Sequence, residues 1–244
     1  MTLEMALLLA FVVLLSGISK AAFAGGLGLL AMPLLLLLFD ANTALGLMLP
    51  LLIGLDLFTL GKYWRCWNLA VLGQLLPAAV LGVLVSALLL GLLSATQLQW
   101  VIGGGSVLFA LRYFSGFHGQ AAILASRPVA VLMGFVSGVS STLLHAGGPP
   151  LAIHLLARKL PATEYIATSA LFFAVLNLVK LPAFIVQQQL TMELLWWALP
   201  FMPLCYAAVQ LGYWLKQRLQ DRHFLPLVHL LLLLAGLKLL WPSG

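Results

Sequence analysis

The chain has 244 residues, of which 63% are hydrophobic and 7% are charged, and its formal net charge is +6. A soluble domain carries about 25% charged residues, so this composition excludes a soluble protein. The basic residues lie in short loops between apolar runs, where they report membrane topology and not nucleic-acid binding. Cys66 and Cys205 lie in different segments and supply neither a disulfide framework nor a metal-binding spacing. We expect an integral membrane protein without a metal or cofactor.

Apolar runs follow one another along the chain and predict helices. Many are Leu-rich and uncharged over 15 or more residues, whereas the strands of a membrane barrel have about 10 residues of alternating polarity. The residues before the first run, Met1–Glu4, lack the basic character of a secretory signal peptide. The runs cover residues 5–18, 25–39, 43–61, 68–93, 97–115, 128–143, 147–157, 165–187, 191–215 and 223–241.

Two pairs of neighbouring runs contain a break. Runs 5–18 and 25–39 are separated by polar residues and glycines, and runs 128–143 and 147–157 by the stretch around His145. A crossing helix needs about 20 residues, so these runs are short. A broken backbone at membrane depth is tolerated only where protein buries it or where it lines a cavity. The breaks therefore predict a site, with a simple kink or a tight helix contact as the alternative.

The basic residues of the loops distinguish two topologies. If each broken pair is a re-entrant hairpin, all nine fall on one face, whereas four and five fall on opposite faces if both pairs cross. The positive-inside rule favours the hairpins, with the basic loops in the cytoplasm and both termini outside. The nine residues are Lys62, Arg65, Arg112, Arg127, Arg158, Lys159, Lys216, Arg218 and Arg222.

The hairpin topology divides the chain into two halves of opposite orientation. We expect a first transmembrane repeat at 1–115, a cytoplasmic connector at 116–127 and a second, inverted repeat at 128–244. The predicted fold is all-α, with two inverted repeats that each contain a broken or re-entrant helix pair and three transmembrane helices. Two sequence matches support the duplication: Ser16-Gly17-Ile18-Ser19 with Ser137-Gly138-Val139-Ser140 and, one residue out of step, Ala24-Gly25-Gly26 with Ala146-Gly147-Gly148.

Inverted repeats with broken helices predict a transporter whose substrate site lies near the membrane midplane. Helix N-termini at the breaks carry about half a positive charge and unpaired N–H groups, which suit an anion. The predicted substrate-binding residues are Lys20, Gly25, Gly26, Ser141, Thr142, His145, Gly147, Gly148, Asn177 and Lys180.

Once the residues near the loops are set aside, the candidates for charges embedded in the membrane are Lys20, Asp56 and Lys180. A charge in the membrane costs at least about 2.5 kcal/mol, which favours a functional role; snorkelling to the interface is the alternative for the lysines. Asp56 has three interpretations: charge balance with a lysine, a coupling proton, or a solvated group. His145 either donates to the anion when protonated, which would make it a second proton-coupling candidate, or is a structural histidine.

These stretches resemble the TauE/SafE family, also called the sulfite exporter or TSUP family. The resemblance implies a permease of the bacterial inner membrane that moves sulfite, sulfonates such as sulfoacetate, or related organic anions, usually outward and with proton coupling. The first half of this chain has Gly-Gly-Leu-Gly where members of the family often have a denser glycine run. The two hairpins therefore need not bind substrate equally. The resemblance is carried by Ser19–Gly28 with Pro33, Leu49-Pro50 with Asp56, Ser141–Pro150, and Phe172–Pro182.

An anion transporter is therefore the leading hypothesis. An anion channel is the main alternative, because the same hairpins could build one. An intramembrane enzyme is disfavoured, because the chain has no His-x-x-x-His, no paired embedded carboxylates and no Gly-x-Ser-x-Gly. The expected partners are a small anion, protons and the lipid bilayer, with no nucleic acid; the sequence leaves a homodimer open.

Overall fold

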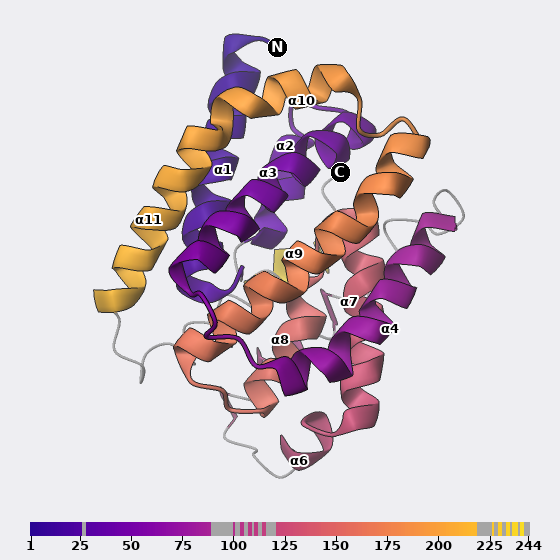
Figure 1. Cartoon of the computed structure of the whole chain (residues 1–244), viewed down its shortest axis with the longest axis vertical. Coiled ribbons are helices and arrows are strands. Elements are labelled where there is room, and N and C mark those ends of the chain that lie inside the picture. The colour runs from indigo at the N-terminus through magenta and orange to yellow at the C-terminus, as the bar shows by residue number, and fades with distance from the viewer. Residues whose placement is uncertain are drawn as a thin grey trace.

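The computed structural model describes residues 1–25, 28–88 and 121–218, together with scattered positions between 100 and 115 and between 226 and 241. The described residues form helices joined by turns (Figure 1), as the sequence predicts. Among the described residues, six helical stretches are long and apolar enough to cross a membrane. About half of the residues of the predicted runs 97–115 and 223–241 lie outside the described residues. The elements are α1 (Leu3–Phe23), η1 (Gly28–Leu30), α2 (Ala31–Leu35), α3 (Ala41–Lys62), α4 (Leu69–Leu88), α6 (Ala121–Leu124), α7 (Arg127–Leu144), α8 (Gly148–Ala157), α9 (Ala162–Val186), α10 (Met192–Ala198), η2 (Leu199–Phe201) and α11 (Met202–Arg218).

Two close helix pairs flank a central pair. Helix α1 packs along α11, α4 packs along α7, and α3 contacts α9 between them. Small residues allow the outer pairs to approach: a Cβ added to Gly17 would lie 2.5 Å from the Cβ of Ala208, and one added to Gly138 would collide with the carbonyl oxygen of Ala79. Close approach of this kind is typical of helices that associate in lipid, where packing replaces the hydrophobic effect.

The first broken pair differs from the expected boundaries. Helix α1 continues to Phe23, so the prediction that its helix stops near residue 18 is wrong, while α2 has only five residues. The polar residues do not end the helix because Ser19 is buried and the ammonium group of Lys20 is paired with Asp56 of α3. The helix ends instead at Ala24, whose φ of 52° is left-handed.

The second broken pair ends its first helix in the same way. Helix α7 stops at His145, whose φ is 50°, and the N–H of His145 donates to the carbonyl of Ser140. At Ala24 the N–H donates to the carbonyl of Ser19. Ala24 and His145 have the same separation, 121 residues, as Asp56 and Asn177, which contact each other directly. The two breaks are thus alike in geometry, while the inverted relation between the halves stays a prediction.

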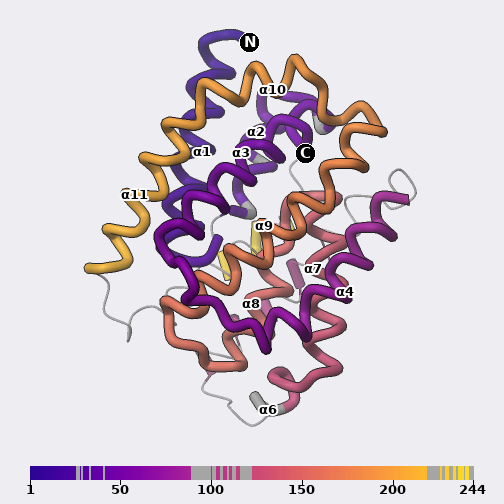
Figure 2. Tube along the Cα trace, in the orientation of Figure 1, coloured from indigo at the N-terminus to yellow at the C-terminus, as the bar shows by residue number. Residues whose placement is uncertain are grey.

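Each broken pair returns the chain toward the end of the bundle from which it came. Figures 1 and 2 show α1 and α3 beginning at one end, and α7 and α9 beginning at the other. The α3–α4 loop meets the start of α9, because Asn68 Nδ2 donates to Glu164 Oε1 over 2.6 Å. The end of α3 also meets the end of α11, since Lys62 Nζ lies 5.5 Å from the centre of the Tyr213 ring. This is the course expected of re-entrant hairpins.

The described basic residues of the loops lie close to a few helix ends. Arg158, at the end of α8, donates to the carbonyl of Ala125 over 3.2 Å and so joins α8 to the segment before α7. Arg112 and Arg222 lie outside the described residues. The described basic residues lie at the end of α3 and in the loop that follows it, at the start of α7, at and after the end of α8, and in the last turn of α11: Lys62, Arg65, Arg127, Arg158, Lys159, Lys216 and Arg218.

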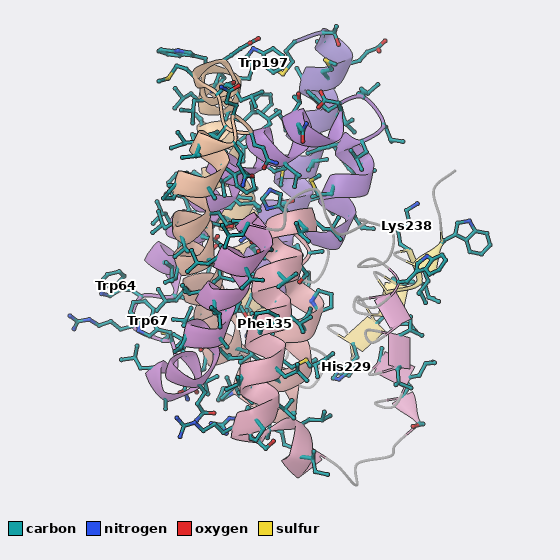
Figure 3. All side chains as sticks on the ribbon, turned by 90° about the vertical axis from the view of Figure 1, so that its right-hand side faces the viewer. Trp64, Trp67, Phe135, Trp197, His229 and Lys238 are labelled. Carbon is teal, nitrogen blue, oxygen red and sulfur yellow. The ribbon has the colours of Figure 1, made fainter. Side chains whose placement is uncertain are left out.

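Tryptophans mark the opposite end and the flank of the bundle. Trp197 of α10 lies at the end where the N-terminus is found, and Trp64 and Trp67 of the α3–α4 loop project from the side at a different height (Figure 3). Tryptophan is enriched at membrane–water interfaces. Between α10 and α11 the helix tightens into η2, which contains Pro200; a proline and a short 3-10 stretch are common causes of a bend.

Candidate functional site

The two breaks meet at a small internal cavity. A Cβ added to Gly148, the first residue of α8, would lie 3.8 Å from the carbonyl oxygen of Gly25. Both glycines line the cavity, whose volume is about 40 Å³. A buried water needs about 10–15 Å³ on this measure, so there is room for a few waters or one small ion. The polar side chains of the lining belong to Ser16, Lys20, Ser141, His145 and Asn177.

A chain of polar contacts begins at Lys20. Its ammonium nitrogen is paired with Asp56 Oδ1, and Asn177 Nδ2 donates to Asp56 Oδ2 over 2.7 Å. Asp56 is fully buried, which is incompatible with the interpretation of a solvated group. A buried carboxylate is tolerated only when paired and hydrogen-bonded. Asp56 therefore balances charge and joins α1 to α9 through α3.

Lys180 continues this chain on α9. Its Nζ donates to the carbonyl of Ser141 over 2.8 Å, to Ser141 Oγ over 2.7 Å and to Asn177 Oδ1 over 3.0 Å. The residue is fully buried, so it does not snorkel. An ammonium group has three donors, and all three are used here. Asn177 faces the same side as Lys180, as the spacing predicts.

Lys180 contacts the end of a helix. Its partner Ser141 lies in the last turn of α7. The last four carbonyls of a helix lack partners within the helix, and the C-terminus carries partial negative charge. Lys180 thus satisfies this end of α7, and its charge reaches the cavity through space and not by direct contact.

His145 lies at the left-handed end of α7 and lines the cavity. Its Nε2 is 3.1 Å from the carbonyl oxygen of Leu45 on α3. A carbonyl only accepts, so Nε2 carries the proton. The other ring nitrogen, Nδ1, is buried without a hydrogen-bond partner in the described part of the chain. One ring nitrogen of His145, Nε2, therefore makes a hydrogen bond to the fold, while the other, Nδ1, is an acceptor without a donor in the described part of the chain.

The remaining predicted residues divide into three groups. Gly25 and Gly148 line the cavity, whereas Gly26 lies outside the described residues. Thr142 donates to the carbonyl of Gly138 over 2.9 Å, which is a bond within its own helix. A Cβ on Gly147 would lie 2.8 Å from the carbonyl of Ser137, so this glycine is needed for packing. Thr142 and Gly147 are not part of the cavity lining.

Several lining residues are not among those predicted from the sequence, and two of them, Ser16 and Phe173, lie close to Lys20 or Asn177 on their helices. Ser16 lies one turn before Lys20 on α1, and Phe173 of α9 places its ring 5.3 Å from Lys20 Nζ. The ring face attracts the cation and closes one side of the cavity. Helical spacing could have identified both residues. Ser16 precedes Lys20 by four residues and Phe173 precedes Asn177 by four, so each lies on the same helix face as a predicted site residue.

The charges around the cavity do not cancel. With Lys20, Lys180 and Asp56 all ionised, two positive charges face one negative charge, which leaves one positive charge in a region of low dielectric. The described residues contain no group of three His, Cys, Asp or Glu side chains that could hold a metal ion. An arrangement of this kind attracts an anion and offers it N–H and O–H donors.

The sequence was compared with known families, proteins and structures. The model of a family described as "Sulfite exporter TauE/SafE" matches residues 9–239, which is nearly the whole chain. No curated protein and no solved structure matches the chain.

Proposed function

Because the chain belongs to the sulfite exporter TauE/SafE family, which is a family of membrane transporters and not of enzymes, we propose that it exports small sulfur-containing or organic anions such as sulfite, sulfonates or sulfoacetate. The anion is bound in the cavity between the two breaks and is released by alternating access. The observation that supports this is the excess positive charge, supplied by Lys20 and Lys180 against Asp56, beside a cavity deep in an apolar bundle.

The description of the family favours the smallest of these substrates, because it names sulfite. The polar side chains of the lining would bind the oxygens of this ion. Phe173 and the apolar part of the lining would contact the rest of the ion. Sulfite is therefore the substrate that we place first.

Proton coupling is proposed for Asp56, with His145 as the second candidate. The carboxylate of Asp56 is bonded both to Lys20, which lines the cavity, and to Asn177. An anion that draws Lys20 away would weaken the pairing of Asp56, and uptake of a proton would then compensate the buried carboxylate. Binding of the anion would in this way favour binding of the proton, and the proton would favour the anion by the same factor.

The proposed location is the bacterial inner membrane, with both termini in the periplasm. The basic ends of α3, α8 and α11 support this orientation, since positive loops stay in the cytoplasm. A homodimer is compatible with the proposal.

Ligand-induced thermal stabilisation of the purified protein tests the proposal. A ligand that binds the folded state stabilises it by an amount that grows with the logarithm of ligand concentration over Kd. We expect sulfite to raise the Tm more than sulfate, thiosulfate, sulfoacetate, taurine or simple carboxylates do. Lys20→Met should remove the shift, while Lys62→Met, which changes a lysine at the end of α3, should keep it.

Flux into proteoliposomes completes the test. We expect saturable sulfite flux that responds to a proton gradient. Flux that rises linearly with concentration and ignores the gradient would indicate a channel instead. If no anion shifts the Tm and no flux is found, the transport proposal is wrong.

A further inference from the structure

Two buried polar atoms beside the cavity have no partner in the described part of the chain: Ser16 Oγ and His145 Nδ1. Both residues belong to the lining. Burial of a polar atom without a hydrogen bond costs free energy. Most buried polar atoms in native proteins therefore have a partner in the protein, in ordered water or in a ligand. These two atoms therefore indicate which bonds a bound ligand forms.

Ser16 can be compared with a related residue of the same chain. Ser137 occupies the matching position in the duplicated Ser-Gly-x-Ser motif, and its hydroxyl donates to the carbonyl of Gly147 over 2.6 Å. The residue 121 positions before Gly147 is Gly26, which lies outside the described residues, while Ser16 Oγ has no partner in the described part of the chain. Ser137 thus has a structural bond, and Ser16 retains a hydroxyl proton that it can donate to an anion.

His145 contributes an acceptor and not a donor. Its Nε2–H is fixed by the carbonyl of Leu45, which leaves Nδ1 as a lone pair in the neutral ring. A second ring proton would add a third cation beside Lys20 and Lys180, against the single carboxylate of Asp56. These are the charged groups that face the site from α1, α9 and α3. Because a buried excess of like charge is unfavourable, the ring is neutral.

We infer that the cavity binds a singly charged anion that carries one hydrogen, with Ser16 Oγ donating to the ion and the hydroxyl of the ion donating to His145 Nδ1. The single negative charge matches the net positive charge of Lys20, Lys180 and Asp56. This inference rests on the proposed function and specifies the form of its substrate. For sulfite, the bound species is hydrogen sulfite.

A matched pair of ligands tests the inference on the unmodified protein. Methanesulfinate has the charge and shape of hydrogen sulfite, with a methyl group in place of the hydroxyl. Both are titrated against the purified full-length protein in mildly acidic buffer, where sulfite is mostly singly protonated, and Kd is obtained from the thermal shift. A site that hydrogen-bonds a ligand hydroxyl discriminates strongly against the analogue that lacks it. We expect hydrogen sulfite to bind at least about tenfold more tightly.

Ser16→Ala and a matched control test the second contact. Loss of a hydrogen bond to a charged ligand should weaken the binding of both ions about tenfold. Ser86→Ala removes another buried hydroxyl, one that bonds only to carbonyls of α4, and should leave both Kd values unchanged. Each Kd is measured against the variant's own Tm without ligand, so a general loss of stability does not enter the comparison.

The outcomes separate this inference from the proposed function. If methanesulfinate binds as tightly as hydrogen sulfite, or if Ser16→Ala binds as tightly as Ser86→Ala, the inference is wrong while anion transport stands. If neither sulfite nor any other anion binds to the unmodified protein and no flux is found, both are wrong. A tenfold preference that Ser86→Ala retains supports the inference.

Discussion

The pairing of Lys20 with Asp56 shows how a lysine and an aspartate come to be buried in an apolar bundle. The side chain of Lys20 is 12% exposed and that of Asp56 is 1% exposed. Neither charge would be tolerated alone at this depth. Because the two groups neutralise each other and Asn177 bonds the second carboxylate oxygen, the pair is accepted. Its contribution to stability is therefore best measured by removing one partner and then both.

Lys20→Met should destabilise the protein by about 3 kcal/mol, because it leaves Asp56 buried without a cation. The double substitution Lys20→Met with Asp56→Asn should recover most of this loss, since no charge is then left unpaired. The unfolding free energy of both variants is measured in detergent by chemical denaturation. Neither variant should bind sulfite. A double variant that is as unstable as the single one would mean that the pair is not the reason for the loss.

Helix packing depends on small residues at the level of whole elements. Helices α4 and α7 approach so closely that three glycines at their contact, Gly82, Gly134 and Gly138, have no room for a Cβ: each would collide with a backbone atom of the facing helix. The pair holds the second break in place, because α7 ends at His145 beside the cavity. A change in the distance between α4 and α7 would therefore reach the site.

Gly138→Ala should lower stability by about 2 kcal/mol and weaken anion binding, because the added methyl group would collide with the carbonyl of Ala79 and force the helices apart. Gly73→Ala is the matched control on α4. Nothing lies within 4 Å of a Cβ at Gly73, and alanine is the better helix former by about 1 kcal/mol. The control should be as stable as the parent or more so. Equal losses in both variants would show that the tight α4–α7 contact is not needed.

The whole molecule is polarised in charge. The loops that join α3 to α4 and α8 to α9 meet through Asn68 and Glu164 and carry basic residues. The opposite end carries Asp40, which caps α3, and Glu193 in the first turn of α10. Such a distribution fixes the orientation of a bundle in a membrane.

A membrane-impermeant thiol reagent can read this orientation through the native Cys66, which is exposed in the α3–α4 loop, because Cys205 is buried. We expect Cys66 to react only from the cytoplasmic side. In a Cys66→Ala background, Lys159→Cys should also react only from the cytoplasm, and Met192→Cys, at the exposed start of α10, only from outside. If Cys66 and the cysteine of the Lys159→Cys variant react from opposite faces of the membrane, the hairpin topology is wrong.

Composition and periodicity alone predict that this chain is a helical membrane protein, that it has two breaks, and that Lys20, Lys180 and Asn177 belong near them. These features follow from local rules, because a long apolar run needs a helix and a charge within it needs a partner. The sequence predicts the end of the first helix too early, because Ser19 and Lys20 interrupt the apolar pattern. In the structure these two residues stay within α1, since Ser19 is buried and Lys20 pairs with Asp56 of α3.

Only the tertiary structure decides which hydrogen bonds and ion pairs the buried polar side chains form. Lys180 donates to Ser141 at the end of α7, and Asp56 pairs with Lys20. Ser16 Oγ has no partner in the described part of the chain, whereas the related Ser137 donates to Gly147. The sequence holds the same motif in both halves and cannot distinguish these two serines. The two serines differ because a hydrogen bond depends on how the helices around each break pack and not on the motif alone.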